Sequence, residues 1–151
     1  ARTDAIGALE GSLEEAIRRG NAYTKAGADM ILLEAPKSAE EIRSFAENVN
    51  IPLMIGIIEG GVTPILSAKE LEELGCKLVI FPNAALRVVH KNVMDLMKEL
   101  KKTGTTKNFL DRMLLFPAFH DLVGKERYRQ LEEKFLEKSE VEEKYKKTVG
   151  F

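Results

Sequence analysis

Short apolar runs alternate with amphipathic stretches over the first two thirds of the chain. The runs Met30–Leu33, Pro52–Ile57 and Leu78–Phe81 have the length and apolar character of strands buried on both faces. Three amphipathic stretches each begin at a serine that is followed three residues later by a glutamate, the capping-box spacing that starts a helix. These pairs are Ser12 with Glu15, Ser38 with Glu41, and Ser67 with Glu70. A longer helix is predicted from Ala84 to Lys102, where Gly104 ends it.

The same unit repeats along this region: a strand, a loop, a capped helix and a short stop. Strand ends are predicted near Thr3, Glu34, Ile57 and Phe81, at intervals close to the βαβ unit of about 30 residues. The fold class is therefore α/β with parallel strands. Periodicity leaves two architectures open, a doubly wound sheet and half of an eight-stranded (β/α)8 barrel.

After Gly104 the pattern changes and predicts helices without strands. A short helix is predicted over Thr105–Leu115, with a break at Phe116–Pro117. A single charged helix is then expected from Lys125 to about Lys147. We expect a strand-and-helix domain at 1–103 and a helical extension at 104–151 that packs on another subunit. A solvated helix closing the domain is the alternative.

Composition narrows the class of protein. The 151 residues carry a net charge of −1 with both signs balanced, which gives no electrostatic footprint for nucleic acid. No apolar run approaches the roughly 18 residues of a membrane span, and the single cysteine, Cys76, fits a reducing compartment such as the cytoplasm. Because the chain starts at Ala1, inside what reads as a strand, we expect a piece of a longer or split protein.

The carboxyl ends of the predicted strands hold the candidate chemistry, because ligands bind there in α/β proteins. Glu34 directly follows a buried run, where a carboxylate needs a partner. Gly60 and Gly61 follow the next strand and would let backbone N–H groups approach an anion, although a plain turn is the alternative. His90 and His120 are interpreted as packing residues, and no His/Cys/Asp cluster has metal-ligand spacing.

A string of short motifs resembles one enzyme superfamily over nearly the whole chain. The motifs are ARTDA at 1–5, AGAD-x-I-x-x-EA at 26–35, IPL at 51–53, EGG-x-TP at 59–64, LS-x-x-EL at 66–71, LG-x-K-L-VIFP at 74–82, GT at 104–105, LDRML at 110–114 and DLVG at 121–124. They resemble the isocitrate lyase and phosphoenolpyruvate mutase superfamily. The combination is most similar to its methylisocitrate lyase, dimethylmalate lyase and carboxyphosphonoenolpyruvate mutase branch.

The resemblance implies a (β/α)8 TIM-type barrel of which this chain is the second half, strands five to eight. It also implies a missing N-terminal half-barrel that carries the Mg²⁺ ligands, a Ser–Gly loop and a mobile loop with the catalytic cysteine. Cys76 does not replace that cysteine, since it precedes a strand at the other end of the barrel. The cofactor expected is Mg²⁺, with no ligand in this chain, and the expected assembly is a homotetramer formed through the C-terminal helices.

The resemblance also implies which residues carry the chemistry. Arg2 would grip the carboxylate of a small substrate and stabilise an enolate, since a guanidinium offers paired donors; an ordinary ion pair with Asp4 is the alternative. Glu34 would orient the substrate or a metal-bound water, or pair with Arg2, and it favours lyase over phosphonomutase chemistry.

Four further residues are expected to bind the substrate: Gly56, Gly60, Gly61 and Pro82. Gly56 stands where the lyases commonly have an asparagine, and Ile58 where a polar residue is common. Either the substrate is more apolar than theirs or the activity has decayed.

The function expected is a Mg²⁺-dependent carbon–carbon lyase. It would cleave a methylisocitrate- or dimethylmalate-like 2-hydroxy acid to pyruvate or a related 2-oxo acid through an enolate. The alternatives are a phosphonomutase or an oxaloacetate-type decarboxylase on the same scaffold, and an inactive half-barrel with only an assembly role.

Overall fold

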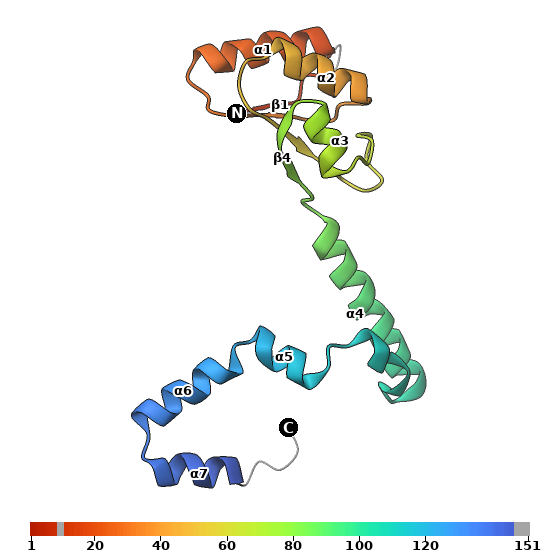
Figure 1. Cartoon of the computed structure of the whole chain (residues 1–151). Helices are drawn as coiled ribbons and strands as arrows, with labels where there is room; N and C mark the ends of the chain where they lie inside the picture. The colour runs from red at the N-terminus through yellow and green to blue at the C-terminus, as the bar shows by residue number, and fades with distance from the viewer. Residues whose placement is uncertain (9–10, 147–151) are drawn as a thin grey trace. The chain divides into compact units, whose positions relative to one another are not determined.

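A computed structural model of the chain describes residues 1–8 and 11–146. The chain divides into two compact units, Ala1–Val93 and Met94–Phe151, and the boundary between them falls within one helix. Figure 1 shows the strands together with the first three helices in the first unit, and helices alone in the second.

Four parallel strands form the sheet of the first unit: β1 (Arg2–Thr3), β2 (Ile31–Leu33), β3 (Leu53–Gly56) and β4 (Cys76–Ile80). Their order in space is β1-β2-β3-β4, the same as in sequence. A doubly wound sheet reverses its strand order at a switch point, and this sheet has none. Because right-handed crossovers that all step in one direction place their helices on one face, this order is that of a barrel segment.

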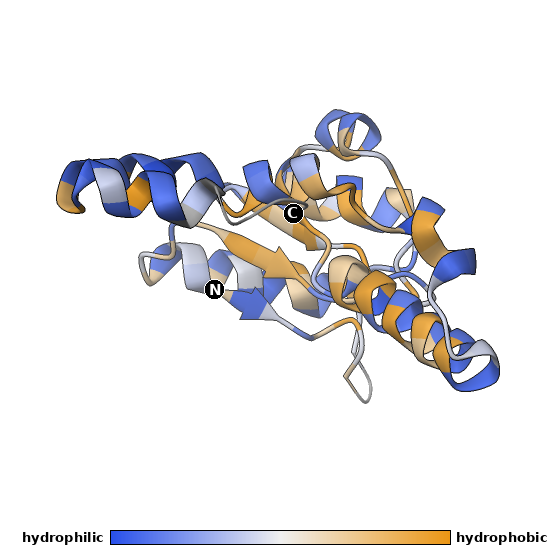
Figure 2. Ribbon diagram, turned by 90° about the horizontal axis from the view of Figure 1, so that it is seen from below, coloured by the Kyte–Doolittle hydropathy of each residue, from blue (hydrophilic) through white to orange (hydrophobic). Residues whose placement is uncertain are grey.

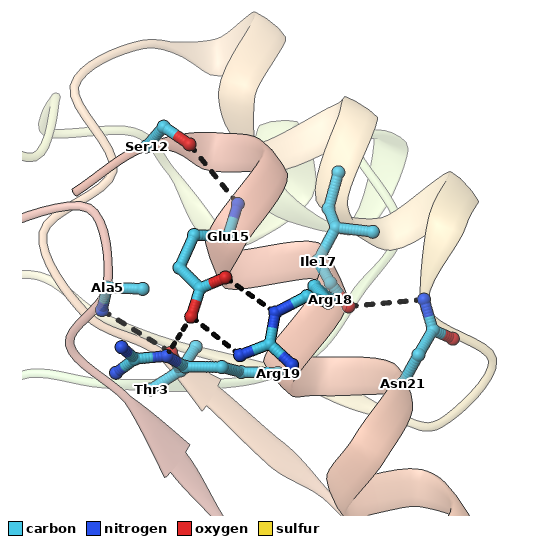
Figure 3. Close-up of polar contacts among 8 residues, drawn as sticks. All are labelled: Thr3, Ala5, Ser12, Glu15, Ile17, Arg18, Arg19 and Asn21. Atoms are coloured by element: carbon cyan, nitrogen blue, oxygen red, sulfur yellow. Dashed lines mark hydrogen bonds and ion pairs between the residues drawn. The ribbon is translucent and has the colours of Figure 1, made fainter. Parts of the chain in front are cut away.

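Each of the first three helices begins at its predicted serine. The helices are α1 (Leu13–Lys25), α2 (Ala39–Asn48) and α3 (Ala68–Glu73), and the hydroxyl of the preceding serine accepts the N–H of Glu15, Glu41 or Glu70 at 3.2 Å. Ser12 and its bond to Glu15 are drawn in Figure 3.

The reciprocal half of the capping box is confirmed at one helix, where Ser67 N–H donates to the Glu70 carboxylate at 2.7 Å. The carboxylate of Glu15 instead accepts from Arg18 and Arg19 at 2.6–2.8 Å, as Figure 3 shows. The Glu41 carboxylate accepts from the N–H of Lys37. The full boxes predicted at Ser12 and Ser38 are therefore wrong, because these carboxylates have better-placed donors.

The hydrophobic core lies between the helices and one face of the sheet. It contains Ile31 and Leu33 of β2, Leu53 and Ile55 of β3, and the helix residues Ala16, Ile42, Phe45 and Leu71. Side chains alternate along a strand, so the intervening residues lie on the other face. There Arg2, Leu32, Met54 and Leu78 are register neighbours across the sheet.

The remaining helices are α4 (Ala84–Thr103), η1 (Lys107–Arg112), α5 (Phe116–Leu122), α6 (Lys125–Phe135) and α7 (Lys138–Lys146). The helix predicted over Thr105–Leu115 is the shorter 3₁₀ helix η1. Phe116–Pro117 does not break a helix but begins α5, because proline is tolerated in a first helical turn.

The single helix predicted from Lys125 to about Lys147 is wrong, since α6 and α7 separate at Leu136 and Glu137. The break lets α7 fold against α6, where the Tyr145 hydroxyl donates to Glu132 at 2.8 Å and Val141 is buried. Lys147 lies outside the described residues. No helix within 1–8 and 11–146 combines the length and the apolar character that a membrane crossing needs.

Candidate functional site

The carboxyl ends of the four strands meet at one edge of the sheet, because all four run parallel. Charged residues gather at β1 and directly after β1 and β2, namely Arg2, Asp4 and Glu34. In Figure 2 β1, next to the N-terminus, is hydrophilic blue, whereas the neighbouring strands are orange. Glu34 N–H donates to Thr3 O at 3.0 Å, so the hydrogen-bonding pattern of the sheet extends past β2 and places Glu34 beside the end of β1.

Arg2 lies between two carboxylates at this edge. Its Nη2 is 2.6 Å from Asp4 Oδ1 and its Nε is 3.0 Å from Asp4 Oδ2. The same Nη2 is 3.5 Å from Glu34 Oε2. The structure therefore brings together Arg2 and Glu34, the two predicted catalytic residues, and adds the ion pair with Asp4 that was the alternative for Arg2.

These contacts fix the charges of the cluster. Hydrogen bonding to Asp4, and then the charge of Glu34, raise the pKa of Arg2, while hydrogen bonding from Arg2 lowers the pKa of Asp4. The side chain of Arg2 remains 54% exposed, against 28% for that of Glu34. The cluster thus consists of a charged guanidinium, more than half exposed, that two carboxylates contact at the end of the sheet.

The backbone beside Glu34 is strained. Ala35 has φ 57° and is the non-glycine residue with positive φ among those that the structure describes. That conformation costs an alanine about 1–2 kcal/mol, and Pro36 disfavours helical conformations in the residue before it. Such strain often accompanies functional sites, and no pattern in the sequence indicated it.

The β3 and β4 side of the edge is apolar. Gly56 is paired with Ile80, and a Cβ on Gly56 would lie 3.7 Å from Ile80 Cγ1. This is an ordinary contact distance, so Gly56 is not required by packing.

The loop after β3 carries the two predicted glycines. Gly60 has φ 81°, and Gly61 N–H donates to Ile58 O at 2.9 Å, which closes a tight turn. Both glycines are exposed. This geometry satisfies the plain-turn alternative and uses the Gly61 N–H inside the turn, while both glycines remain on the surface. Glu59, in the same turn, contacts Arg87 of α4, a pair that the sequence did not reveal because 28 residues separate its members.

Pro82 is exposed and follows β4 at the same end of the sheet. Cys76 lies at the opposite end, as the first residue of β4, where burial raises the pKa of its thiol to about 11. His90 Nδ1 lies 2.9 Å from Leu86 O within its own helix, and the ring of His120 lies 5.7 Å from that of Phe116. Neither Cys76 nor His90 contacts the Arg2 cluster in the first unit.

The residues at this edge do not fit a metal ion by themselves. Within 1–8 and 11–146 no group of three His, Cys, Asp or Glu side chains could hold one. Asp4 and Glu34 both face Arg2, whose charge repels a cation. A divalent ion at this edge would need ligands from another part of the protein.

Comparison with known proteins agrees with this arrangement. Residues 1–101 match the family model for phosphoenolpyruvate phosphomutase. The chain is 39% identical over 135 residues to 2,3-dimethylmalate lyase of Eubacterium barkeri, covering 89% of this chain and 46% of that protein. It is 39% identical over 140 residues to 2-methylisocitrate lyase of Aeropyrum pernix, covering 93% of this chain and 45% of that protein.

Solved structures show the same relationship. A crystal structure of 2,3-dimethylmalate lyase, a PEP mutase/isocitrate lyase superfamily member, has a TM-score of 0.76 at 31% identity and covers 89% of this chain and 46% of that chain. A phosphonopyruvate hydrolase in complex with oxalate and Mg²⁺ has a TM-score of 0.75 at 28% identity and covers 91% of this chain and 48% of that chain.

The chain thus spans about half the length of the curated relatives it matches. These neighbours are TIM-barrel enzymes, and four parallel strands in sequential order are what half of such a barrel contains. The half-barrel prediction is confirmed, and the doubly wound alternative is excluded. The chain belongs to the PEP mutase/isocitrate lyase superfamily, and the two relatives described above are named lyases.

Proposed function

We propose that this chain supplies the substrate-carboxylate side of a Mg²⁺-dependent carbon–carbon lyase. The reaction would cleave a 2-hydroxy acid of the dimethylmalate or methylisocitrate type to pyruvate or a related 2-oxo acid. The observation that carries this proposal is the Arg2 guanidinium, held beside Glu34 at the carboxyl ends of adjacent strands. The names of the two relatives supply the substrate class.

Arg2 would bind the substrate carboxylate and the oxygen that becomes an enolate. Asp4 occupies Nε and Nη2, so a ligand carboxylate binds Nη1 or takes the place of Asp4. A planar guanidinium meets two oxygens at once and stabilises the negative charge that develops as the bond breaks. Glu34 would fix the orientation of Arg2 through the charge of its carboxylate.

Gly56, Gly60, Gly61 and Pro82 would line the rest of the substrate site, with Mg²⁺ held by residues outside this chain. We propose that those residues belong to an N-terminal half-barrel that closes the sheet at its two free edges, β1 and β4. Leu78, 43% exposed on the face turned away from the helices, would be covered by that half. An unpaired sheet edge is otherwise a site of aggregation.

Phosphonomutase chemistry is the second candidate, because the family model that matches residues 1–101 is that of phosphoenolpyruvate phosphomutase. The same guanidinium would stabilise the enolate left by a broken C–P bond. Analysis of products separates the two reactions, since a mutase releases no second acid.

The test uses the full-length protein with Mg²⁺ and follows pyruvate release from dimethylmalate and methylisocitrate. Removing a donor that stabilises a developing oxyanion costs about 10²- to 10³-fold, so we expect Arg2→Ala to lower kcat/KM by that factor and Arg2→Lys by less. Arg18→Ala is the matched control, since Arg18 also pairs with a glutamate on the surface but lies in α1. Unchanged kcat/KM in Arg2→Ala would remove the role proposed for Arg2.

We further propose that helices after Gly104 join subunits into a homotetramer. Leu115 is 75% exposed and Leu122 72%, and Phe116 and Phe135 are also exposed; clusters of exposed apolar residues mark interaction sites. Light scattering should show a smaller mass for Leu115→Lys than for the control Ile65→Lys on the first unit. A tetramer that survives Leu115→Lys together with Leu122→Lys contradicts the proposal.

We also propose a cytoplasmic location, because the single cysteine is a buried free thiol.

A further inference from the structure

The loop between β3 and α3 is held firmly at its two sides but is exposed at its tip. Ile57 is buried and its N–H donates to Ile80 O at 2.8 Å, and Thr63 is also buried. Between them the chain turns through Gly60, with φ 81°, and Val62 is exposed. The position of the two glycines relative to the strand ends therefore depends on what holds Glu59, the residue that precedes them.

Arg87 holds Glu59 from a different element. It lies in the first turn of α4, and its Nη1 donates to the backbone oxygen of Glu59. The same nitrogen is 3.7 Å from Glu59 Oε2. One guanidinium thus contacts both the backbone and the carboxylate of the residue that begins the glycine turn.

The environment of the Glu59 carboxylate shows why the contact with Arg87 stabilises the turn. Its Oε2 atom is enclosed by protein and has no hydrogen-bond partner. An enclosed acceptor without a hydrogen bond destabilises the conformation that encloses it, unless a nearby charge compensates. Arg87 is the charge found at that distance, so the turn in this conformation depends on it.

Arg87 is also placed to act on the candidate site. The helix α4 follows β4, and the loop that holds Glu59 follows β3, so both begin at the carboxyl end of the sheet. Arg87 does not need to touch a ligand to affect binding there. Arg87 fixes the backbone conformation of Gly60 and Gly61. Glycine has the greatest backbone freedom of any residue, so the two glycines do not fix this conformation by themselves.

We infer that Arg87 is a positioning residue of the candidate site: by holding Glu59 it fixes the Gly60–Gly61 backbone in the conformation that receives the anionic ligand. The inference rests on the proposed function only for the identity of the site. It predicts that loss of the Arg87 guanidinium weakens binding of the ligand more than it slows the chemical step.

The experiment compares Arg87→Gln, Arg87→Lys and Glu59→Gln with a matched control, Arg43→Gln. Arg43 likewise donates through Nη1 to the backbone oxygen of a glutamate, Glu73, but at the end of α3. Two measurements are made on the full-length protein. One is amide hydrogen exchange of residues 59–62, and the other is the Kd of oxalate with Mg²⁺ by calorimetry, with KM and kcat added where turnover is found.

For Arg87→Gln we expect exchange at 59–62 to rise about tenfold and the Kd of oxalate and KM to rise about tenfold, with kcat changed less than threefold; a tenfold change corresponds to 1.4 kcal/mol. Arg87→Lys should recover part of the affinity, because it keeps the charge but not the planar fork. Arg43→Gln should change neither measurement.

Oxalate binding by Arg87→Gln equal to that of Arg43→Gln overturns the inference, whether or not exchange rises. A fall in kcat without a change in Kd also overturns it, since positioning of the loop would then not govern binding. If the wild-type protein binds oxalate but releases no pyruvate from any candidate substrate, the proposed lyase reaction is overturned. The inference about Arg87 is then still decided by the Kd of oxalate.

Discussion

The two units of this chain bury their apolar residues to very different extents. In the first unit three helices share one core with the sheet, and Phe45, Ile42 and Ile55 are completely buried. In the described part of the second unit the buried apolar residues are Phe109 and Val141, and large side chains such as Leu122 and Phe135 are exposed. An amphipathic helix has to pack on another element to bury its apolar face, and the sheet provides that surface in the first unit.

The two units also differ in how their helix ends are capped. Serine side chains cap α1, α2 and α3, whereas η1, α5 and α6 have no side-chain cap. Most helical stability in proteins comes from packing of the apolar face. The first unit is thus stabilised by a shared core and by capped helices, whereas the described helices of the second unit have fewer of both kinds of interaction.

The largest contrast should come from deleting a phenylalanine in each unit. Phe45→Ala removes a completely buried ring and should cost about 3–5 kcal/mol of unfolding free energy. Phe135→Ala removes a ring that is 73% exposed and should cost less than about 0.5 kcal/mol. Urea unfolding followed by circular dichroism measures both. Equal losses would show that the second unit is packed in solution.

A second contrast compares two glycines that have positive φ. Gly75 has φ 96°, and a Cβ there would lie 2.8 Å from Ala46 Cβ; Gly75→Ala should cost about 2–4 kcal/mol through backbone strain and overpacking. Gly124 has φ 68° with open space around it, so Gly124→Ala should cost about 1–2 kcal/mol through strain alone. The same urea titrations apply, and a larger loss at Gly124 would reverse the comparison.

The helix caps give a smaller effect. Ser38→Ala removes the oxygen that accepts Glu41 N–H at 3.2 Å and should lower the unfolding free energy by about 1 kcal/mol. Thr106→Ala at the start of η1 removes no side-chain cap and should be neutral to within about 0.5 kcal/mol. Thermal unfolding detects the difference, and a loss at Thr106 that matches Ser38 would contradict it.

The smallest effect concerns acid stability. Hydrogen bonds from Arg18 and then Arg19 lower the pKa of Glu15 from 4.5 to about 2. Because the pKa is lower in the folded state, the stabilisation is complete above pH 4.5 and is lost as the pH falls toward 2. Glu15→Gln should therefore unfold at slightly lower urea than wild type at pH 7, and this difference should shrink by pH 2.

Glu133→Gln in α6 is the control for Glu15→Gln, because Glu133 pairs with one arginine, Arg129, rather than two. Its effect at pH 7 should be smaller. If the difference between Glu15→Gln and wild type grows as the pH falls, the pairing of Glu15 with the two arginines does not stabilise the folded state.

Much of the first unit was predictable from local patterns. The three serine caps and the four strands were found at the expected places, with β4 starting two residues before the prediction, at Cys76. The C-terminal helices were predicted less well. The break after Phe135 accompanies the packing of α7 on α6, and the helix that begins at Phe116 has its proline in the first turn of α5. Glu34 was identified by its position after a buried run and Arg2 through a family motif, and the roles of both stay predictions.

The sequence by itself determined the alternation of strands and capped helices, because apolar periodicity and capping act within a few residues. Only the tertiary structure decided that Arg2 meets Glu34 at 3.5 Å, that Ala35 is strained and that Arg87 holds Glu59. Those contacts depend on strand order and register, which bring together residues far apart in the chain, and no local pattern specifies them.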